Sequence, residues 1–327
     1  MCDTSSAESV QGEKVDVAVN IFAKPYQTSL SLLSLWQHSH RHLGIIWLQF
    51  EPFGCKYDTI LPYHIVEYLR EQLGAHCEVF QPNYWLDLNA FDPSRMHDNT
   101  YRLGVRYQYA FEHSQGRRLF LMHNDVLILR DIIGDLLASM DDSFAIGPLG
   151  QCWNCPANYA ELTQNVMGCA PCTPYSYLQF RPSHEELCRL YALAHQRGVF
   201  ARPYDAGLTD PIFKAQPWPL PECRINEWAC LLDLKKTRPL CMPYGPDFPP
   251  GAYQKCGVIN LDIAVAWFRD MHARGFHARH FDLKSHLRHW VGTGKTTPIK
   301  YAQAEDNAHR LLQRLFPSFL HWLEKRI

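Results

Sequence analysis

Residues 118–127 read RLFLMHNDVL, a largely apolar run that leads into the polar triplet His123-Asn124-Asp125 before apolar residues resume. A short apolar run bounded in this way is consistent with a buried β-strand. In open α/β sheets, ligands bind beyond the carboxyl ends of the strands. The triplet is therefore the first candidate for a binding site.

The sequence on either side of this run alternates between apolar, β-branched segments and helical patterns. From the apolar spacing we expect strands at residues 15–22, 43–50, 77–80 and 144–146, and helices at 29–39, 61–73, 101–113 and 131–140. Alternation at such short intervals favours a mostly parallel sheet with helices on both faces. The predicted fold class is α/β, with a Rossmann-like sheet.

The pattern changes after Gly150. Cysteine, proline and tyrosine become dense at residues 151–182, which predicts a loop-rich insert. Further helices are expected at 183–197, 226–234, 261–274, 302–315 and 317–325. We therefore predict a disordered tail at 1–14, a catalytic domain at 15–260 that contains the insert, and a helical extension at 261–327.

Composition limits the class of protein. The chain has 327 residues, a net charge of -1 and 46% hydrophobic residues, which is enough apolar material for a large core. Near-neutral charge disfavours nucleic-acid binding, which usually needs a strong basic excess. No apolar run is long enough to span a bilayer, and residues 1–14 lack the pattern of a secretory signal. We expect a cytoplasmic protein without a transmembrane segment.

The triplet and the segments before it resemble GT-A glycosyltransferases of the family-2 type, in which a strand delivers an Asp-x-Asp triplet to the donor site. The resemblance covers most of residues 15–150 as a pattern. It implies transfer of a sugar from a nucleoside diphosphate sugar, with UDP as the expected nucleotide, to an acceptor that the sequence does not identify. It also implies a divalent cation, Mn²⁺ or Mg²⁺, held by Asp125 against the diphosphate.

The same resemblance assigns further residues to the donor site. Ala23, Lys24 and Pro25 follow the first strand at its nucleotide end, and Arg102 and Arg106 precede the strand that carries the triplet. The first acidic position of the triplet is replaced by a histidine, His123. Its imidazole can bind a manganese-like ion or donate a hydrogen bond to the ribose or the diphosphate, so metal dependence is left open. Asn124 completes the triplet.

A catalytic base and a late metal ligand are expected downstream. Glu227 follows a proline-rich loop at the start of an expected helix, a position similar to that of the base in inverting GT-A enzymes. The alternative is that Glu227 only favours a helix N-terminus. The histidines from His272 to His289 are unusually dense. Within this group His280 or His286 is a candidate late ligand of the donor-site metal, although a solvated helix surface explains most of these histidines equally well.

Two Cys-x-x-Cys pairs predict a structural zinc site. Cys152 and Cys155 are separated from Cys169 and Cys172 by thirteen residues. Two such pairs complete a tetrahedral Cys₄ site that leaves no position for chemistry. The alternative is a set of reduced thiols or a disulfide, and one of the scattered cysteines can replace a member of the quartet.

Two other functions remain open. A nucleotidyltransferase has related α/β architecture, but such enzymes usually begin with a glycine-rich, basic loop, and residues 23–26 contain no glycine. A non-catalytic zinc-containing scaffold that binds protein should have lost the donor-site acid, and Asp125 is present. The sequence leaves the stereochemistry and the oligomeric state undetermined.

Overall fold

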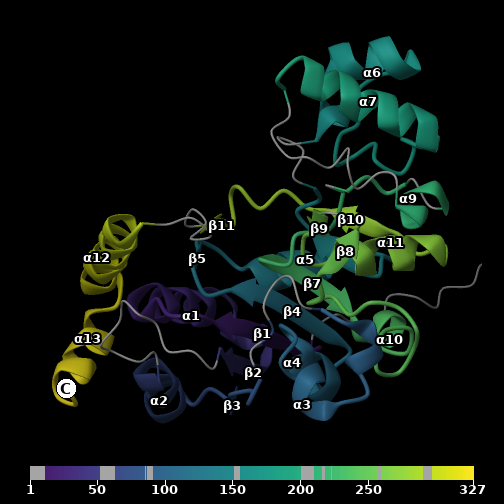
Figure 1. Ribbon diagram of the computed structural model, residues 1–327. Helices are drawn as coiled ribbons and strands as arrows, with labels where there is room; N and C mark the ends of the chain where they lie inside the picture. Colours follow the sequence, from purple (N-terminus) through teal and green to yellow (C-terminus); the bar gives the residue numbers. More distant parts are fainter. Residues whose placement is uncertain are drawn as a thin grey trace, which may run out of the picture. The chain divides into compact units, whose positions relative to one another are not determined.

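The computed structural model describes residues 12–51, 63–84, 86, 91–150, 155–199, 210–215, 218–221, 223–256, 259–289 and 297–327. The chain divides into two compact units (Figure 1). Unit 1 comprises Met1–Pro82, Tyr109–Asp141 and Leu283–Ile327, and unit 2 comprises Asn83–Gln108 and Asp142–Asp282. The domain boundaries predicted from the sequence, after residues 14 and 260, stay predictions.

Unit 1 is built on four parallel strands. Their order is β4-β1-β2-β3, and every neighbouring pair runs parallel. The bounds are β1 (Val15–Ile21), β2 (Leu43–Phe50), β3 (Cys77–Phe80) and β4 (Arg118–His123). Asn20 is paired with His123 in register, so β1 and β4 end at the same edge. The parallel sheet predicted from the sequence is confirmed.

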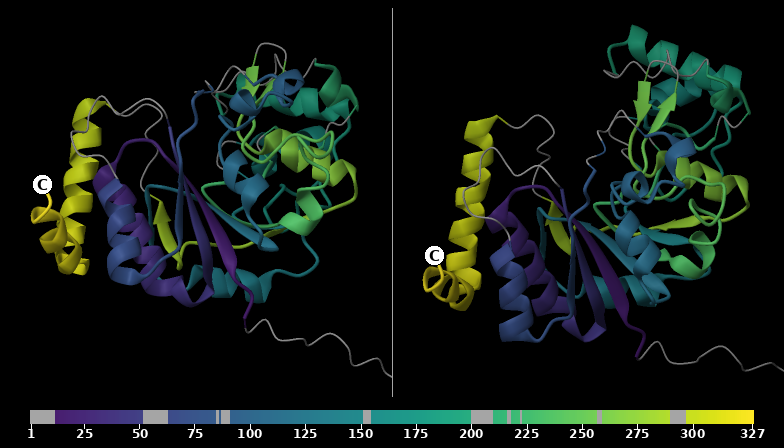
Figure 2. Two further views of the ribbon diagram at one scale, coloured as in Figure 1. Left: turned by 90° about the horizontal axis from the view of Figure 1, so that it is seen from below. Right: turned by 60° about the horizontal axis from the view of Figure 1, so that its bottom comes forward.

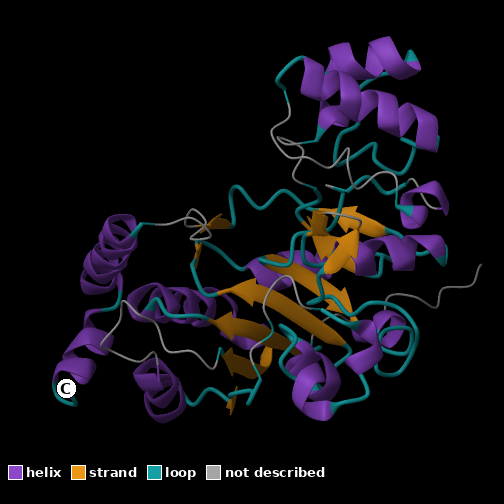
Figure 3. Cartoon of the chain, in the orientation of Figure 1, coloured by secondary structure: helices purple, strands orange, loops and turns teal. Residues whose placement is uncertain are grey.

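Helices pack beside these strands, drawn in orange in Figure 3. Helix α1 contacts α2, α5 and α12, and Figure 2 shows the yellow α12 along the purple α1. The helices of unit 1 are α1 (Pro25–Ser39), α2 (Tyr63–Leu73), α5 (Ile132–Ser139), α12 (Pro298–Leu315) and α13 (Pro317–Glu324), with the 3₁₀ turn η1 (His40–His42). Helix α4 (Gln108–His113) begins at the boundary with unit 2.

The core of unit 1 lies around β1, which is buried along its whole length. This burial includes the charged side chain of Asp16. Its carboxylate accepts hydrogen bonds from the Ile45 amide at 2.8 Å and the Ser114 hydroxyl at 2.6 Å. A buried charge is tolerated when its oxygens are hydrogen-bonded in this way, so Asp16 joins β1 to its neighbours without an unpaired charge.

Among the described residues, unit 2 contains five short strands. Strand β6 (Ala145–Gly147) runs parallel to β10 (Ala278–His280) and antiparallel to β7 (Ala229–Asp233). Strands β8 (Gln254–Cys256) and β9 (Ile259–Leu261) form a separate antiparallel pair. The helices are α3 (Asn99–Arg102), α6 (Ala160–Met167), α7 (His184–Gln196), α9 (Pro211–Ala215), α10 (Leu234–Thr237) and α11 (Val265–Ala273), with 3₁₀ turns η2 (Pro93–Arg95) and η3 (Pro156–Asn158).

Three local expectations need correction. The helix predicted at 226–234 is wrong, because this segment contains strand β7, whose residues are all buried. A short apolar run buried on both faces has no periodicity that separates strand from helix. The single helix predicted at 101–113 is two short helices, with Tyr107 between them at a positive φ of 61°. The loop-rich insert contains helix α6.

No helix in the described part of the chain is both long enough and apolar enough to cross a membrane.

Candidate donor site in unit 1

The triplet lies where strand β4 ends. His123 is the last residue of β4, and Asn124 and Asp125 form the turn into β5 (Val126–Ile128). The side-chain Nδ2 of Asn124 donates to the Ala23 carbonyl oxygen at 3.2 Å and to the Thr28 hydroxyl oxygen at 2.9 Å. Asn124 therefore fastens the turn after β4 to the turn after β1.

Asp125 is the centre of the site. Its side chain is only 3% exposed, and its Oδ2 accepts a hydrogen bond from the Lys24 Nζ at 2.8 Å. Burial alone would raise the pKa of this carboxyl. The contact with the His289 ring and the positive charge of Lys24 outweigh burial and hold the pKa well below its ordinary value. Asp125 is therefore ionised throughout the physiological range.

Two imidazoles approach the other oxygen of the same carboxylate. The Oδ1 atom of Asp125 lies 3.3 Å from His289 Nε2 and 3.8 Å from His123 Nδ1. One nitrogen of each imidazole and one carboxylate oxygen of Asp125 all lie within 4.8 Å of one another. In the described part of the chain, this is the group of histidine, cysteine or carboxylate side chains that converges closely enough to hold a metal ion. Two imidazole nitrogens and one carboxylate suit Mn²⁺ and later transition metals better than Mg²⁺, which prefers oxygen ligands.

A chain of backbone and side-chain contacts brings His289 to this place. The hydroxyls of Ser31 and Ser34 on α1 accept hydrogen bonds at 3.0 Å from the amides of Val126 and Ile128. Strand β5, held in this way, pairs antiparallel with β11 (Leu287–His289), and His289 lies opposite Val126. The site therefore depends on a pairing between segments more than 150 residues apart.

The turn after β1 directs the Lys24 side chain toward Asp125. Ala23 and Lys24 both have left-handed backbones, with φ of 58° and 61°. Residues other than glycine adopt this conformation at a cost of about 1–3 kcal/mol each and keep it only where surrounding contacts impose it. Pro25 follows as the first residue of α1, where its missing N–H leaves no helical hydrogen bond unmade. The predicted trio Ala23, Lys24 and Pro25 thus forms one turn against the triplet.

The other predicted donor-site and catalytic residues belong to unit 2. The Arg102 guanidinium donates to the Met96 carbonyl oxygen at 3.2 Å. Arg106 lies in a tightly packed loop, because a Cβ added to Gly251 would come within 1.8 Å of the Arg106 carbonyl oxygen. Glu227 is 5% exposed and precedes strand β7. Within unit 1, the structure brings the predicted residues Lys24, His123 and Asp125 together.

The surroundings of Glu227 form a second buried, charged group. Its Oε2 lies 3.9 Å from the Arg224 Nε, and Arg224 also pairs with Asp262 at 2.8 Å. Burial raises the pKa of the Tyr107 phenol well above its ordinary value, and the negative charge of Glu227 adds to this effect. Glu227 is thus placed among groups that keep their protons.

The late histidines have separate environments. His280, at the end of β10, accepts a hydrogen bond at its Nδ1 from the Leu149 amide at 3.0 Å. The ring of Tyr175 meets it edge-on, with 4.7 Å between the ring centroids. In unit 1, His286 Nε2 lies 2.9 Å from the Asp135 carboxylate. The histidine beside Asp125 is His289, which the sequence included in the dense group without distinguishing it.

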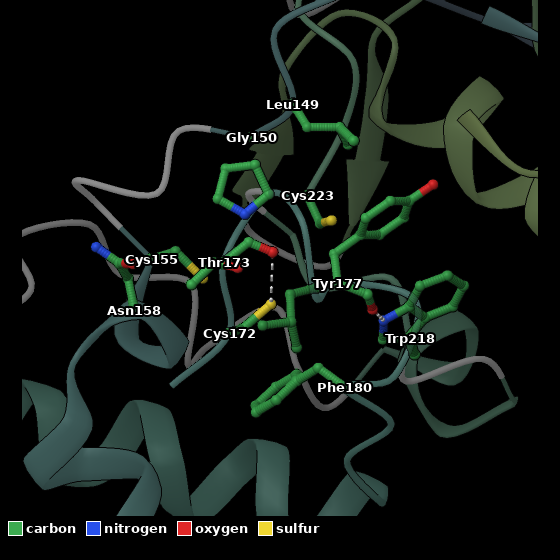
Figure 4. Close-up of a pocket in the computed structure, with 12 residues that line it drawn as sticks. Leu149, Gly150, Cys155, Asn158, Cys172, Thr173, Tyr177, Phe180, Trp218 and Cys223 are labelled. Carbon is green, nitrogen blue, oxygen red and sulfur yellow. Dashed lines mark hydrogen bonds between the residues drawn. The ribbon is translucent and has the colours of Figure 1, made fainter. Parts of the chain in front are cut away.

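Of the predicted zinc ligands, Cys152 lies outside the described residues, and Cys155, Cys169 and Cys172 belong to unit 2 and form no disulfide. Figure 4 shows Cys155 and Cys172 in the wall of one pocket, together with Cys223. The Cys172 amide donates to the Ala157 carbonyl oxygen at 2.8 Å, which joins Cys172 to the chain two residues after Cys155. No described cysteine belongs to the group of converging metal-binding side chains, which consists of His123, Asp125 and His289.

Comparisons with known proteins give structural likenesses only. No family model matches the chain, and no curated protein matches it. A mannosyltransferase from Pyrobaculum calidifontis, in complex with GDP-Man and Mn²⁺, is 11% identical with a TM-score of 0.31, over 47% of this chain and 46% of that one. The chain thus spans less than half of that relative.

Two other solved structures match over more of the chain. Core-mannan synthase A from Aspergillus fumigatus, in its Mn/GDP form, is 10% identical with a TM-score of 0.37, over 92% of this chain and 84% of that one. Mouse xyloside xylosyltransferase 1, in its apo form, is 11% identical with a TM-score of 0.37, over 83% and 85%. The three relatives are glycosyltransferases, the class that the sequence predicts. Because their TM-scores lie below 0.5, the proposals below depend on the side chains of this chain alone.

Proposed function

We propose that the chain is a glycosyltransferase that transfers a sugar from a nucleoside diphosphate sugar to an acceptor. The observation that carries this proposal is the convergence of His123, Asp125 and His289 within 4.8 Å at the carboxyl end of β4. A carboxylate that stays ionised, beside two imidazoles, fits a divalent cation. The Lys24 ammonium, 2.8 Å from the same carboxylate, adds a second positive group.

The roles of the residues follow from their chemistry. A divalent cation, when bound, would neutralise charge that develops on the leaving diphosphate. His123, Asp125 and His289 would hold it, with Mn²⁺ fitting the two nitrogen ligands better than Mg²⁺. Lys24 would bind a phosphate oxygen as a point charge. Asn124 would keep the two turns in register through its hydrogen bonds to Ala23 and Thr28.

Glu227 is the proposed catalytic base. Its support is its burial at 5% exposure and its place two residues before β7, where the carboxylate lies 3.9 Å from the Arg224 Nε. A positioned carboxylate can take the proton of an acceptor hydroxyl during sugar transfer. Arg102, Arg106 and His280 stay predictions for binding the donor or the cation.

We also propose a structural zinc at Cys152, Cys155, Cys169 and Cys172. The spacing of the two pairs supports it, as does the hydrogen bond from the Cys172 amide to Ala157, two residues after Cys155. Cys223 lines the same pocket as Cys155 and Cys172 and is the described cysteine best placed to replace a member of the quartet. Metal analysis of the purified, reduced protein should find close to one zinc per chain, and its absence would refute the site.

A donor assay tests the proposed function. Purified protein is incubated with UDP- and GDP-linked sugars in Mn²⁺, in Mg²⁺ or in a chelator. Water serves as the acceptor of the sugar in place of the unidentified one, and release of nucleoside diphosphate is measured. We expect release with one donor, fastest in Mn²⁺ and lost in chelator. Parallel reactions with nucleoside triphosphates and sugar phosphates test the nucleotidyltransferase alternative, which would release pyrophosphate instead. The UDP linkage and the cytoplasmic location stay predictions.

A further inference from the structure

The start of helix α1 receives its cap from the C-terminal helix α12. The first N–H groups of a helix lack partners within the helix, and α1 has no side-chain cap from Lys24, its own N-cap residue. The Glu305 carboxylate fills this role, because it accepts hydrogen bonds from the Tyr26 amide at 2.9 Å and the Gln27 amide at 3.3 Å. A negative charge at this end is also favoured by the helix dipole.

A second contact lies one helical turn earlier on α12. The Tyr301 hydroxyl oxygen accepts a hydrogen bond from the Lys24 amide at 3.0 Å. Tyr301 and Glu305 are four residues apart, so they share one face of α12. Both are buried, with 7% and 6% exposure. Helix α12 therefore binds the backbone on both sides of Pro25, at Lys24 and at Tyr26. The backbone of this turn sets the direction of the Lys24 side chain.

The opposite side of this turn is held by the triplet itself. Asn124 donates to the Ala23 carbonyl oxygen at 3.2 Å. The left-handed residues Ala23 and Lys24 are thus fixed between the turn after β4 and helix α12. Two neighbouring left-handed residues persist only under such constraints, so loss of the α12 contacts should let the turn relax.

We propose that Tyr301 and Glu305 are positioning residues, which hold the Ala23–Lys24 turn in its left-handed form and thereby keep the Lys24 ammonium on Asp125. The importance of this positioning for catalysis rests on the proposed function. The contacts themselves are independent of that function. The same C-terminal segment supplies His289, nine residues before Pro298 at the start of α12. One continuous stretch of chain therefore provides a candidate metal ligand and the support for the lysine opposite it.

Amine labelling tests the positioning without any ligand. Intact protein is treated briefly with acetic anhydride, and the acetylation rate of each lysine is read by mass spectrometry. Lys24 is 6% exposed, whereas Lys300 on α12 is exposed and serves as the reference. In the wild type, Lys24 should react at least about tenfold more slowly than Lys300. Tyr301→Phe and Glu305→Gln should each bring the Lys24 rate closer to that of Lys300.

Two controls separate positioning from general loosening. Asp306→Asn removes the same charge from the neighbouring, exposed position and should leave Lys24 protected. Lys236, which pairs with Asp142 in unit 2, should keep its wild-type rate in every variant. Unchanged protection of Lys24 in both Tyr301→Phe and Glu305→Gln would overturn the proposal. Equal acceleration of Lys236 would also overturn it, because the variants would then loosen the chain as a whole.

A binding measurement then separates this proposal from the proposed function. If Lys24 leaves Asp125, a cation gains access to both carboxylate oxygens while the diphosphate loses a positive partner. Glu305→Gln should therefore bind Mn²⁺ alone as tightly as the wild type or more tightly, and should bind Mn²⁺-UDP or Mn²⁺-GDP about tenfold more weakly. Weakening of both by the same factor contradicts positioning. Failure of the wild type to bind either nucleotide contradicts the proposed function, and the labelling result stands independently.

Discussion

Asp125 in unit 1 and Glu227 in unit 2 are both buried carboxylates, yet their partners differ in kind. The Oδ2 atom of Asp125 contacts the Lys24 ammonium, and its Oδ1 atom lies near the imidazoles of His123 and His289. The imidazoles can bind a cation, and the ammonium can bind a phosphate. Glu227 lies near Arg224, which itself pairs with Asp262. An arginine keeps its charge at any physiological pH, whereas an imidazole can be neutral and bind a metal.

The contrast shows that burial of an acid does not by itself indicate its chemistry. Around Asp125, two imidazole rings and an ammonium converge on one carboxylate, which is the arrangement that the proposed site for a cation and a diphosphate requires. Around Glu227 lie a fixed guanidinium and the Tyr107 phenol, which keeps its proton, and Glu227 is the proposed proton acceptor among them.

The largest effect is expected at Asp125. Asp125→Asn keeps the size of the side chain but removes the negative charge that binds Lys24 and, in the proposed site, the cation. Turnover should therefore fall by about a thousandfold or more. Asp306→Asn, an exposed change in the same unit, is the matched control and should have little effect. Transfer rates at saturating Mn²⁺ give the comparison. Near-normal turnover in Asp125→Asn would remove Asp125 from the donor site.

Glu227→Gln should have the next largest effect. Loss of a general base commonly lowers turnover by about a hundredfold, with donor affinity unchanged because the base contacts the acceptor. Turnover and donor affinity are measured separately, by steady-state kinetics and by calorimetry. An equal loss in both would make Glu227 a binding residue, and no loss in either would make its role structural.

Lys24→Met should weaken nucleoside diphosphate binding by about ten- to a hundredfold, since a charge-assisted hydrogen bond contributes about 1.5–3 kcal/mol. Affinity for Mn²⁺ alone should hold or rise, because the ammonium no longer competes for the Asp125 carboxylate. Calorimetric titrations with Mn²⁺ and then with the nucleotide measure both. A parallel loss of Mn²⁺ affinity would show that Lys24 supports the site only as a structural partner.

The smallest effect on turnover is expected at Asp270 in unit 2, where the change should appear in stability. Burial raises the pKa of Asp270 to about 6, and the charge of Asp247 adds to the shift while the Phe248 amide opposes it. The native state thus loses stability as pH rises from about 4, the unfolded value, through about 6. Asp270→Asn lacks this loss.

Urea unfolding at two pH values measures the effect. At pH 7.5 the Asn variant should be more stable than the wild type by about 1–3 kcal/mol, and at pH 4 the difference should vanish. Its amide oxygen can still accept the hydrogen bond that the Phe248 amide donates at 3.0 Å. A variant that is less stable at both values would contradict the raised pKa.

The sequence predicted those parts of the fold that depend on local pattern. Strands β1, β2, β3 and β4 are long or bounded apolar runs, and each was expected within a residue or two of its observed bounds. The triplet and the turn at Lys24 were also expected. Both follow directly from strands that end at one edge of a parallel sheet.

The rest depends on pairing between distant segments. His289 reaches Asp125 through three paired residues of β5 and β11, a ladder too short to leave a pattern in either sequence. Strand β7 was read as a helix because an apolar run buried on both faces has no diagnostic spacing. Glu305 and Tyr301 act through hydrogen bonds to the backbone of α1, and such contacts leave no motif.

One spectroscopic measurement tests the central claim, that His123, Asp125 and His289 hold a divalent cation against a nucleoside diphosphate. Protein with ¹⁵N-labelled histidine is loaded with Mn²⁺, and pulsed electron paramagnetic resonance reads the nuclei coupled to the metal. We predict couplings from two imidazole nitrogens, one lost in His123→Ala and the other in His289→Ala. Addition of UDP or GDP should add a ³¹P coupling. Bound Mn²⁺ without an imidazole coupling, or without a ³¹P coupling to either nucleotide, would contradict the account.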